Sequence, residues 1–152
     1  MIQLIDHINL VVKDIDVSRR FYGETLGLTE SFRKILEGDW VDEVTGIEDV
    51  CADCVFYEFP GGTTRIELLH FRSGSGASSD YNELPDTIGV RHLAFQVDDL
   101  DTFVTHLREQ GVHLYSEPVR VPFPVGREGL TKRLCYFRDP DGVLLEVAEY
   151  TR

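Results

Sequence analysis

Apolar and polar residues alternate in short runs along the chain, and these runs follow the same order in its two halves. The first half begins with an apolar run over Ile2–Val12, which predicts a buried strand. Acidic residues and a serine follow, and they predict the start of a helix over Val17–Leu26 that ends at Gly27. In the second half an apolar strand around His92 precedes a helix whose apolar residues recur at helical spacing from Leu100 and which ends at Gly111.

Three strand-like stretches follow each predicted helix. They cover Leu28–Ile35, Cys54–Phe59 and Thr64–Phe71 in the first half, and His113–Val119, Leu134–Phe137 and Val143–Glu149 in the second. The last two strands of each half are separated by turn residues, at Pro60–Gly62 and at Asp139–Gly142, which predicts hairpins. Each half is therefore a predicted β-α-β-β-β module.

The duplication extends to residues that can carry chemistry. His7 and His92 lie near the starts of equivalent strands, and Glu67 and Glu146 lie within the last strands of the two halves. Because side chains alternate across a strand, each of these four residues shares a face with small or polar neighbours and opposes an apolar face. We expect the apolar faces to pack under the helices and the four polar side chains to point into a shared concave space.

Two segments interrupt the symmetry of the halves. Gly38–Val50 carries Trp40 among apolar and acidic residues, which predicts a short amphipathic helix or a lid. Ser73–Ser79 is rich in glycine and serine, as linkers are. We therefore predict one domain over residues 1–152, with a first module at about 1–72, a linker at about 73–87 and a second module at about 88–150.

Composition and charge narrow the possible functions. The 152 residues fit about one domain, since a domain typically has roughly 100–200 residues, and 42% of them are hydrophobic. The formal net charge of −12 argues against nucleic acid as a partner, because phosphate binding requires a basic surface. No apolar run approaches the roughly 18 residues of a membrane span, and the first residues lack the features of a signal peptide.

Cysteine usage points to a reducing compartment. The chain has three cysteines, which cannot all pair with one another, so we expect a cytoplasmic protein without structural disulfides. Cys51 and Cys54 have the spacing of a redox motif, but they lack a helix start that would activate a thiol. We interpret this pair as packing residues.

Two imidazoles and two carboxylates form a ligand set that suits a first-row divalent ion such as Ni²⁺, Zn²⁺, Co²⁺, Mn²⁺ or Fe²⁺. We predict one such ion, bound by His7, Glu67, His92 and Glu146, with a coordination position left open for substrate. Such an ion polarises a bound carbonyl or hydroxyl oxygen, and Glu67 or Glu146 could then move a proton at the adjacent carbon. The residues predicted to bind the substrate are Arg65, Asn9, Gln96 and Trp40.

These residues resemble the vicinal-oxygen-chelate superfamily, the group of glyoxalase I, bleomycin-resistance proteins and dioxygenases. The resemblance spans nearly the whole chain. It rests on Asp6-His7-Ile8, on Phe21-Tyr22 with Leu26-Gly27-Leu28, on Ile66-Glu67-Leu68-Leu69, on Arg91–Asp99, and on Asp139–Gly142 with Leu145-Glu146. It implies an α+β fold in which two βαβββ modules form a cupped, eight-stranded mixed sheet around a metal, usually in a homodimer.

The same resemblance orders the candidate activities. The four ligands of glyoxalase I fall on His7, Glu67, His92 and Glu146, which implies a metal-dependent lyase or isomerase acting on a small molecule. Methylmalonyl-CoA epimerases usually have glutamine at the place of Glu67, and an epimerase is the first alternative. A non-catalytic drug-binding protein of the bleomycin-resistance type, which would hold a planar hydrophobic drug between Trp40, Phe56 and Tyr57, is the second. A dioxygenase ranks last, because such enzymes typically use three protein ligands.

Overall fold

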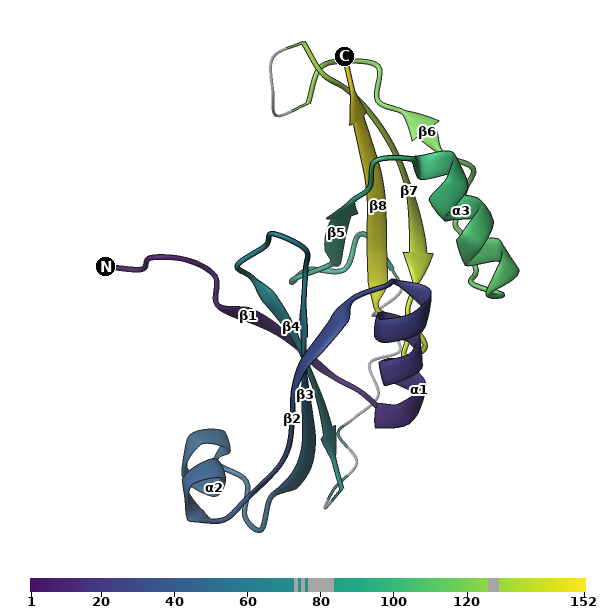
Figure 1. The fold of residues 1–152 in the computed structure, drawn as a ribbon. Helices are drawn as coiled ribbons and strands as arrows, with labels where there is room; N and C mark the ends of the chain where they lie inside the picture. The colour runs from purple at the N-terminus through teal and green to yellow at the C-terminus, as the bar shows by residue number, and fades with distance from the viewer. Residues whose placement is uncertain (73, 75, 77–83, 126–128) are drawn as a thin grey trace. The chain divides into compact units, whose positions relative to one another are not determined.

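Each half of the chain forms its own four-stranded mixed sheet (Figure 1). A computed structural model describes residues 1–72, 74, 76, 84–125 and 129–152. The chain divides into two compact units, Met1–Ser78 and Ser79–Arg152. Much of the predicted linker at about 73–87 lies outside the described residues.

The first unit contains β1 (His7–Val11), α1 (Ile15–Arg20) with a π-helical turn (Phe21–Thr25), β2 (Thr29–Glu37), α2 (Asp39–Thr45), β3 (Cys51–Glu58) and β4 (Arg65–Phe71). Its strand order is β1-β4-β3-β2. β1 runs parallel to β4, whereas β3 is antiparallel to both of its neighbours. The first and last strands of the module are therefore neighbours in the sheet.

The second unit repeats this topology. It contains β5 (His92–Gln96), α3 (Leu100–Glu109), β6 (Val119–Arg120), β7 (Thr131–Arg138) and β8 (Leu144–Thr151). The strand order is β5-β8-β7-β6, with β5 parallel to β8 and the other pairs antiparallel. The predicted α+β class with two βαβββ modules is confirmed, and α2 is an insertion between two strands of the first module.

Carboxylates begin the helices, as the sequence predicts. Asp14 accepts hydrogen bonds from two backbone N–H groups at the start of α1, and Asp99 accepts one from Thr102 at the start of α3. The first helix begins at Ile15, two residues before the predicted start, because Asp14 is its cap. Gly111, just beyond the end of α3, has a φ of +74°, a left-handed conformation that glycine adopts at little cost.

Two predicted strands were too long. Ile2–Val12 was predicted as a buried strand, but β1 begins at His7 and its residues alternate between exposed and half-buried. It lies at the edge of its sheet, and its partner β4 begins at Arg65, opposite His7, so the residues before His7 meet no strand. His113–Val119 was also predicted as a strand, yet only Val119–Arg120 is one. Pro118 has no N–H to donate to a ladder.

A core lies on one face of each sheet, under the helices. In the first unit Tyr57, Ile66 and Leu68 are buried, and the ring of Tyr57 lies 6.4 Å from that of Tyr22, beyond α1. In the second unit α3 buries Leu100, Val104 and Leu107, and the strands bury Phe137, Leu145 and Val147. We call these the helix faces and the opposite ones the ligand faces.

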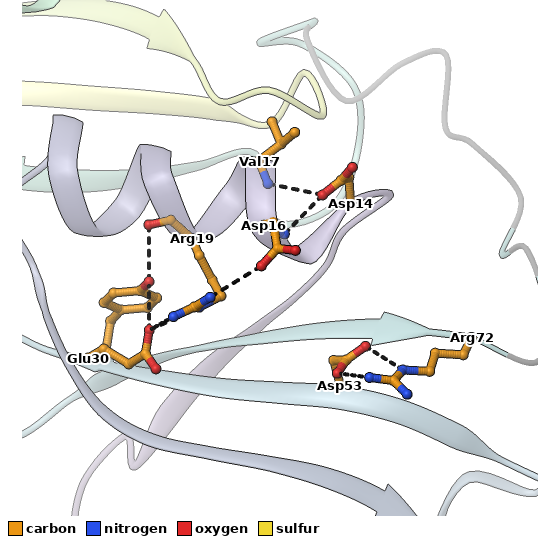
Figure 2. A network of polar contacts seen from close by, with 8 residues as sticks. Asp14, Asp16, Val17, Arg19, Glu30, Asp53 and Arg72 are labelled. Atoms are coloured by element: carbon orange, nitrogen blue, oxygen red, sulfur yellow. Dashed lines mark hydrogen bonds and ion pairs between the residues drawn. The ribbon is translucent and has the colours of Figure 1, made fainter.

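Polar contacts tie α1 to the first sheet (Figure 2). The guanidinium of Arg19 donates two hydrogen bonds to Glu30 on β2, and the hydroxyl of Tyr57 donates to the backbone carbonyl of Arg19 at 3.1 Å. Burial and the charge of Glu30 raise the pKa of Tyr57 to about 12, so this hydroxyl stays protonated. On the same helix face, Asp53 of β3 accepts two hydrogen bonds from Arg72.

The predicted amphipathic segment forms the short helix α2, beside the ends of β2 and β3 (Figure 1). Val41 is buried against Val50 and Ala52, with Leu36 and Phe71 at the margin of this cluster. Ala52 pairs with Phe71 in the sheet, at an even spacing from Phe56 and Glu67. α2 therefore packs on the ligand face of the first sheet, opposite α1. Within the described residues, no helix is long and apolar enough to cross a membrane.

Candidate functional site

A histidine and a glutamate lie together on the ligand face of each unit. In the first unit, Nε2 of His7 on β1 lies 3.5 Å from Oε2 of Glu67 on β4. In the second unit, Nε2 of His92 on β5 lies 3.5 Å from Oε2 of Glu146 on β8. The parallel pairing of first and last strands produces both contacts, because it brings together residues that are far apart in the sequence. We call the pairs the first and second half-sites.

An aromatic ring packs against each histidine. Phe56 lies opposite Glu67 in the β3–β4 hairpin, and its ring is 5.4 Å from that of His7. Tyr136 lies opposite Glu146 in the β7–β8 hairpin, 5.2 Å from the ring of His92. Sequence reasoning named Phe56 only as a possible drug contact and missed Tyr136. Both rings occupy equivalent places and restrict the orientation of the imidazoles.

Neutral groups bind the carboxylate of the first half-site. The side-chain amide of Asn9 donates to Oε2 of Glu67 at 2.9 Å, and the thiol of Cys54 donates to Oε1 at 3.4 Å. Burial and the adjacent charge of Glu67 raise the pKa of the Cys54 thiol to about 12, so it remains a thiol. Cys54 lies three positions after Cys51 within β3, so their side chains point to opposite faces. No disulfide joins Cys51 and Cys54.

A cation binds the carboxylate of the second half-site. Nζ of Lys132, at the start of β7, donates to Oε1 of Glu146 at 2.5 Å. Burial alone would lower the pKa of Lys132, but the hydrogen bond and charge of Glu146 outweigh it and leave this pKa above its ordinary value. Sequence reasoning gave Lys132 no role. The register of the β7–β8 hairpin, which the sequence pattern did not give, brings Lys132 and Glu146 to the same face.

The other predicted site residues lie at different positions. Arg65 donates to Asp6 at 2.6 Å and its guanidinium lies 4.6 Å from the centre of the Phe56 ring, beside the first half-site. Asp6 also contacts Nδ1 of His7 at 2.8 Å, and these hydrogen bonds from His7 and Arg65 lower its pKa. Gln96, at the end of β5, is exposed opposite Ala148. Trp40 is 56% exposed on α2.

Each half-site has the chemistry and spacing of two metal ligands. An imidazole nitrogen and a carboxylate oxygen bind a first-row ion at about 2.0–2.2 Å, which places adjacent ligand atoms about 2.8–3.1 Å apart at octahedral angles and about 3.3–3.6 Å apart at tetrahedral angles. The observed 3.5 Å in both units fits that separation. Over the part of the chain that the structure describes, no three His, Cys, Asp or Glu side chains gather into a cluster that could hold an ion. Each unit thus offers two ligands.

Comparison with known proteins agrees with this fold. The family model "Glyoxalase/Bleomycin resistance protein/Dioxygenase superfamily" matches residues 4–147. The Escherichia coli protein YaeR, described as uncharacterized, is 32% identical, with 95% of each chain covered. Bovine mitochondrial methylmalonyl-CoA epimerase is 23% identical, with 95% of this chain and 73% of the epimerase covered.

Solved structures give the same result. A glyoxalase family protein from Bacillus cereus matches with a TM-score of 0.85 and 30% identity, over 100% of this chain and 97% of that one. The family match over residues 4–147 spans both modules and the positions of His7, Glu67, His92 and Glu146. The chain belongs to the Glyoxalase/Bleomycin resistance protein/Dioxygenase superfamily.

Proposed function

We propose that this chain is a metal-dependent enzyme that moves a proton at a carbon next to a bound carbonyl or hydroxyl group. The observation that carries the proposal is the pair of equivalent half-sites, each with an imidazole nitrogen 3.5 Å from a carboxylate oxygen. Neither half-site has enough ligands alone, since a catalytic ion typically takes at least three protein ligands. His7, Glu67, His92 and Glu146 would together hold one ion.

The donor set suits Ni²⁺, Zn²⁺, Co²⁺, Mn²⁺ or Fe²⁺. When bound, the ion supplies Lewis-acid polarisation of a substrate oxygen. Glu67 or Glu146 would accept the proton from the adjacent carbon, while the electrons of the C–H bond remain on the substrate. The same carboxylate would return the proton to the neighbouring carbon in an isomerase. In an epimerase, the second carboxylate would deliver a proton to the opposite face of the first carbon.

The remaining predicted residues would orient the substrate. Asn9 and Gln96 present amides on the ligand faces, and Arg65 presents a guanidinium beside His7. Trp40 extends from α2, which packs on the ligand face of the first sheet. We propose that Trp40 contacts an apolar part of the substrate and that Arg65 contacts a carboxylate.

A glyoxalase I-like lyase is the leading candidate, since Glu67 provides the fourth ligand of that pattern. Protein purified without added metal should hold one ion per chain by elemental analysis and convert the hemithioacetal of a 2-oxoaldehyde and a thiol. His7→Ala and His92→Ala should each abolish both metal content and turnover, because both half-sites hold the same ion. If each substitution removed one of two ions, the half-sites would be independent and the proposed shared site would be wrong.

An epimerase is the second candidate, and the similarity to methylmalonyl-CoA epimerase favours it. With methylmalonyl-CoA in D₂O, an epimerase would exchange the hydrogen at the substituted carbon with solvent, whereas a lyase would leave that hydrogen in place. Tight binding of a planar drug that is unaffected by chelators, without turnover of either substrate, would instead identify a non-catalytic drug-binding protein.

We further propose that the protein works as a cytoplasmic homodimer. Three cysteines that form no disulfide suit a reducing compartment. Light scattering during size-exclusion chromatography should give about twice the 17.3 kDa mass of one chain. A monomeric mass at micromolar concentration would contradict the dimer and leave the metal-site proposal intact.

A further inference from the structure

The second half-site contains a cation of the protein's own. The side chain of Glu146 is only 5% exposed and that of Lys132 only 13%, and the two form an ion pair at 2.5 Å. Lys132 also lies with Nζ 5.7 Å from the centre of the Tyr150 ring. A buried carboxylate and a nearly buried ammonium therefore face one another on the same sheet face as His92.

The two oxygens of Glu146 have different partners. Oε1 accepts the hydrogen bond from Lys132, and Oε2 lies 3.5 Å from Nε2 of His92. The corresponding carboxylate of Glu67 is bound by the neutral amide of Asn9 and the neutral thiol of Cys54. The arrangement leaves Oε2 of Glu146 as the oxygen for an ion held with His92, while Lys132 holds the other oxygen.

An ammonium group and a divalent ion that bind the same carboxylate weaken each other's binding. Each would be stabilised by the same negative charge, and each would repel the other across a poorly solvated site. By reciprocity, if the ammonium weakens binding of the ion, binding of the ion weakens the ammonium–carboxylate pair equally. Without any ion, however, the ammonium prevents a buried carboxylate from standing unpaired, which would be strongly unfavourable.

We infer that Lys132 is a positioning residue that neutralises Glu146 in the metal-free protein, restricts it to binding an ion through Oε2, and so weakens metal binding. The inference rests on the proposed function in one respect, that Glu146 is a metal ligand. Its consequence is an exchangeable ion: the metal-free chain stays folded, and the affinity for the ion is lower than its four ligands would otherwise give.

The test replaces the ammonium with an uncharged side chain of similar length. Metal-stripped wild type and Lys132→Met are titrated with Zn²⁺ in competition with a chromophoric chelator, and their unfolding in urea is followed with and without Zn²⁺. We expect Lys132→Met to bind Zn²⁺ at least about tenfold more tightly, since a nearby positive charge has been removed. The metal-free variant should unfold at lower urea, and saturating Zn²⁺ should restore most of the difference.

Two control variants separate charge from shape. Lys132→Arg keeps the positive charge and should bind Zn²⁺ within about threefold of wild type, since the electrostatic opposition persists. Lys13→Met makes the same chemical change at an exposed position in the turn after β1 and should alter neither measurement. If Lys132→Met does not fold, Lys132→Gln removes the charge while retaining a hydrogen-bond donor, and the same increase in affinity is expected.

Equal or weaker Zn²⁺ binding by the uncharged variants would overturn the inference, even if wild type binds one ion as proposed. A wild-type chain that binds no Zn²⁺ would overturn both the inference and the proposed function. The two failures are distinguishable, because only the second concerns the wild-type protein. Both readouts are independent of turnover.

Discussion

Each unit has a buried carboxylate that pairs with a basic side chain. The two pairs lie on opposite faces of equivalent sheets. In the first unit Asp53 binds Arg72 on the helix face, the face opposite the His7–Glu67 pair. In the second unit Glu146 binds Lys132 on the ligand face itself. The strand topology of the two sheets is the same, so the difference arises from single side chains placed on a common frame.

What the modules share is the part that would contact an ion. Each has a histidine and a glutamate on neighbouring parallel strands, with an aromatic ring packed on the histidine. The two modules differ in the group that binds Oε1 of the carboxylate. This group is a thiol in the first unit and an ammonium in the second. Both modules contain the histidine and the glutamate, whereas the surroundings of the two carboxylates are unequal.

The largest effect should come from breaking the pair on the second ligand face. Glu146→Leu leaves the ammonium of Lys132 nearly buried without a counter-charge, which should lower the free energy of unfolding by about 3 kcal/mol. Glu67→Leu leaves only a neutral amide and thiol without their acceptor, and should cost about 1 kcal/mol. Urea unfolding of both metal-stripped variants measures the difference.

The double variant Glu146→Leu/Lys132→Met is the matched control, since it removes both charges at once. It should recover much of the stability that Glu146→Leu loses. If Glu67→Leu and Glu146→Leu were equally destabilising, the two carboxylates would be electrostatically equivalent. The proposed difference between a carboxylate bound by neutral groups and one bound by an ammonium would then be wrong.

Breaking the Asp53–Arg72 pair on the helix face of the first unit should cause a smaller loss of stability, and this loss should depend on pH. The hydrogen bonds from Arg72 hold the pKa of Asp53 below its ordinary value of 3.8, so the pair contributes stability above that value and loses it as pH falls through the lowered pKa. Asp53→Asn should therefore shift the urea midpoint downward at pH 7 by less than Glu146→Leu, because Arg72 reaches solvent. The shift should shrink as the pH falls below 3.8.

Asp101→Asn is the control variant for the urea unfolding of Asp53→Asn. Asp101 accepts two hydrogen bonds from Arg133, as Asp53 does from Arg72, but its side chain is 69% exposed. Solvent screens this pair, so the midpoint should change less than with Asp53→Asn. An equal or larger change with Asp101→Asn would show that burial does not govern the strength of these pairs.

The smallest effect concerns the amide that distinguishes the first ligand face. Asn9→Ala removes the hydrogen bond to Glu67, and the second module has alanine, Ala94, at the equivalent place. Because Asn9 is exposed and water can replace its amide, the free energy of unfolding should fall by only about 0.5 kcal/mol. Urea unfolding checks the value, and a loss above that of Glu67→Leu would contradict it.

Periodicity and duplication were sufficient to predict the modules and the two histidine–glutamate pairs, because these depend on strand alternation and repeated order. Strand ends were predicted less well. β1 begins only where its parallel partner β4 begins, at His7 opposite Arg65, and no pattern within Ile2–Asp6 records that. Pro118 was visible in the sequence and should have shortened the predicted strand over His113–Val119.

Lys132 was missed for a different reason. It lies fourteen residues from Glu146, and their contact depends on the register of the β7–β8 hairpin. Lys132 pairs with Tyr150, four residues after Glu146, so its long side chain reaches Glu146 diagonally along the ligand face. Such a diagonal contact depends on the strand register, whereas the duplicated histidines and glutamates could be found from sequence order alone.

The parallel pairing of first and last strands also determines when each half-site can form during folding. Asn9 and Glu67 are 58 residues apart, so their contact closes a loop that includes the β2–β3 and β3–β4 hairpins. Contacts between distant residues form slowly, because the entropy of the intervening chain is lost first. A growing chain that has not yet reached β4 would contain His7 without its glutamate, so a completed half-site marks a completed module.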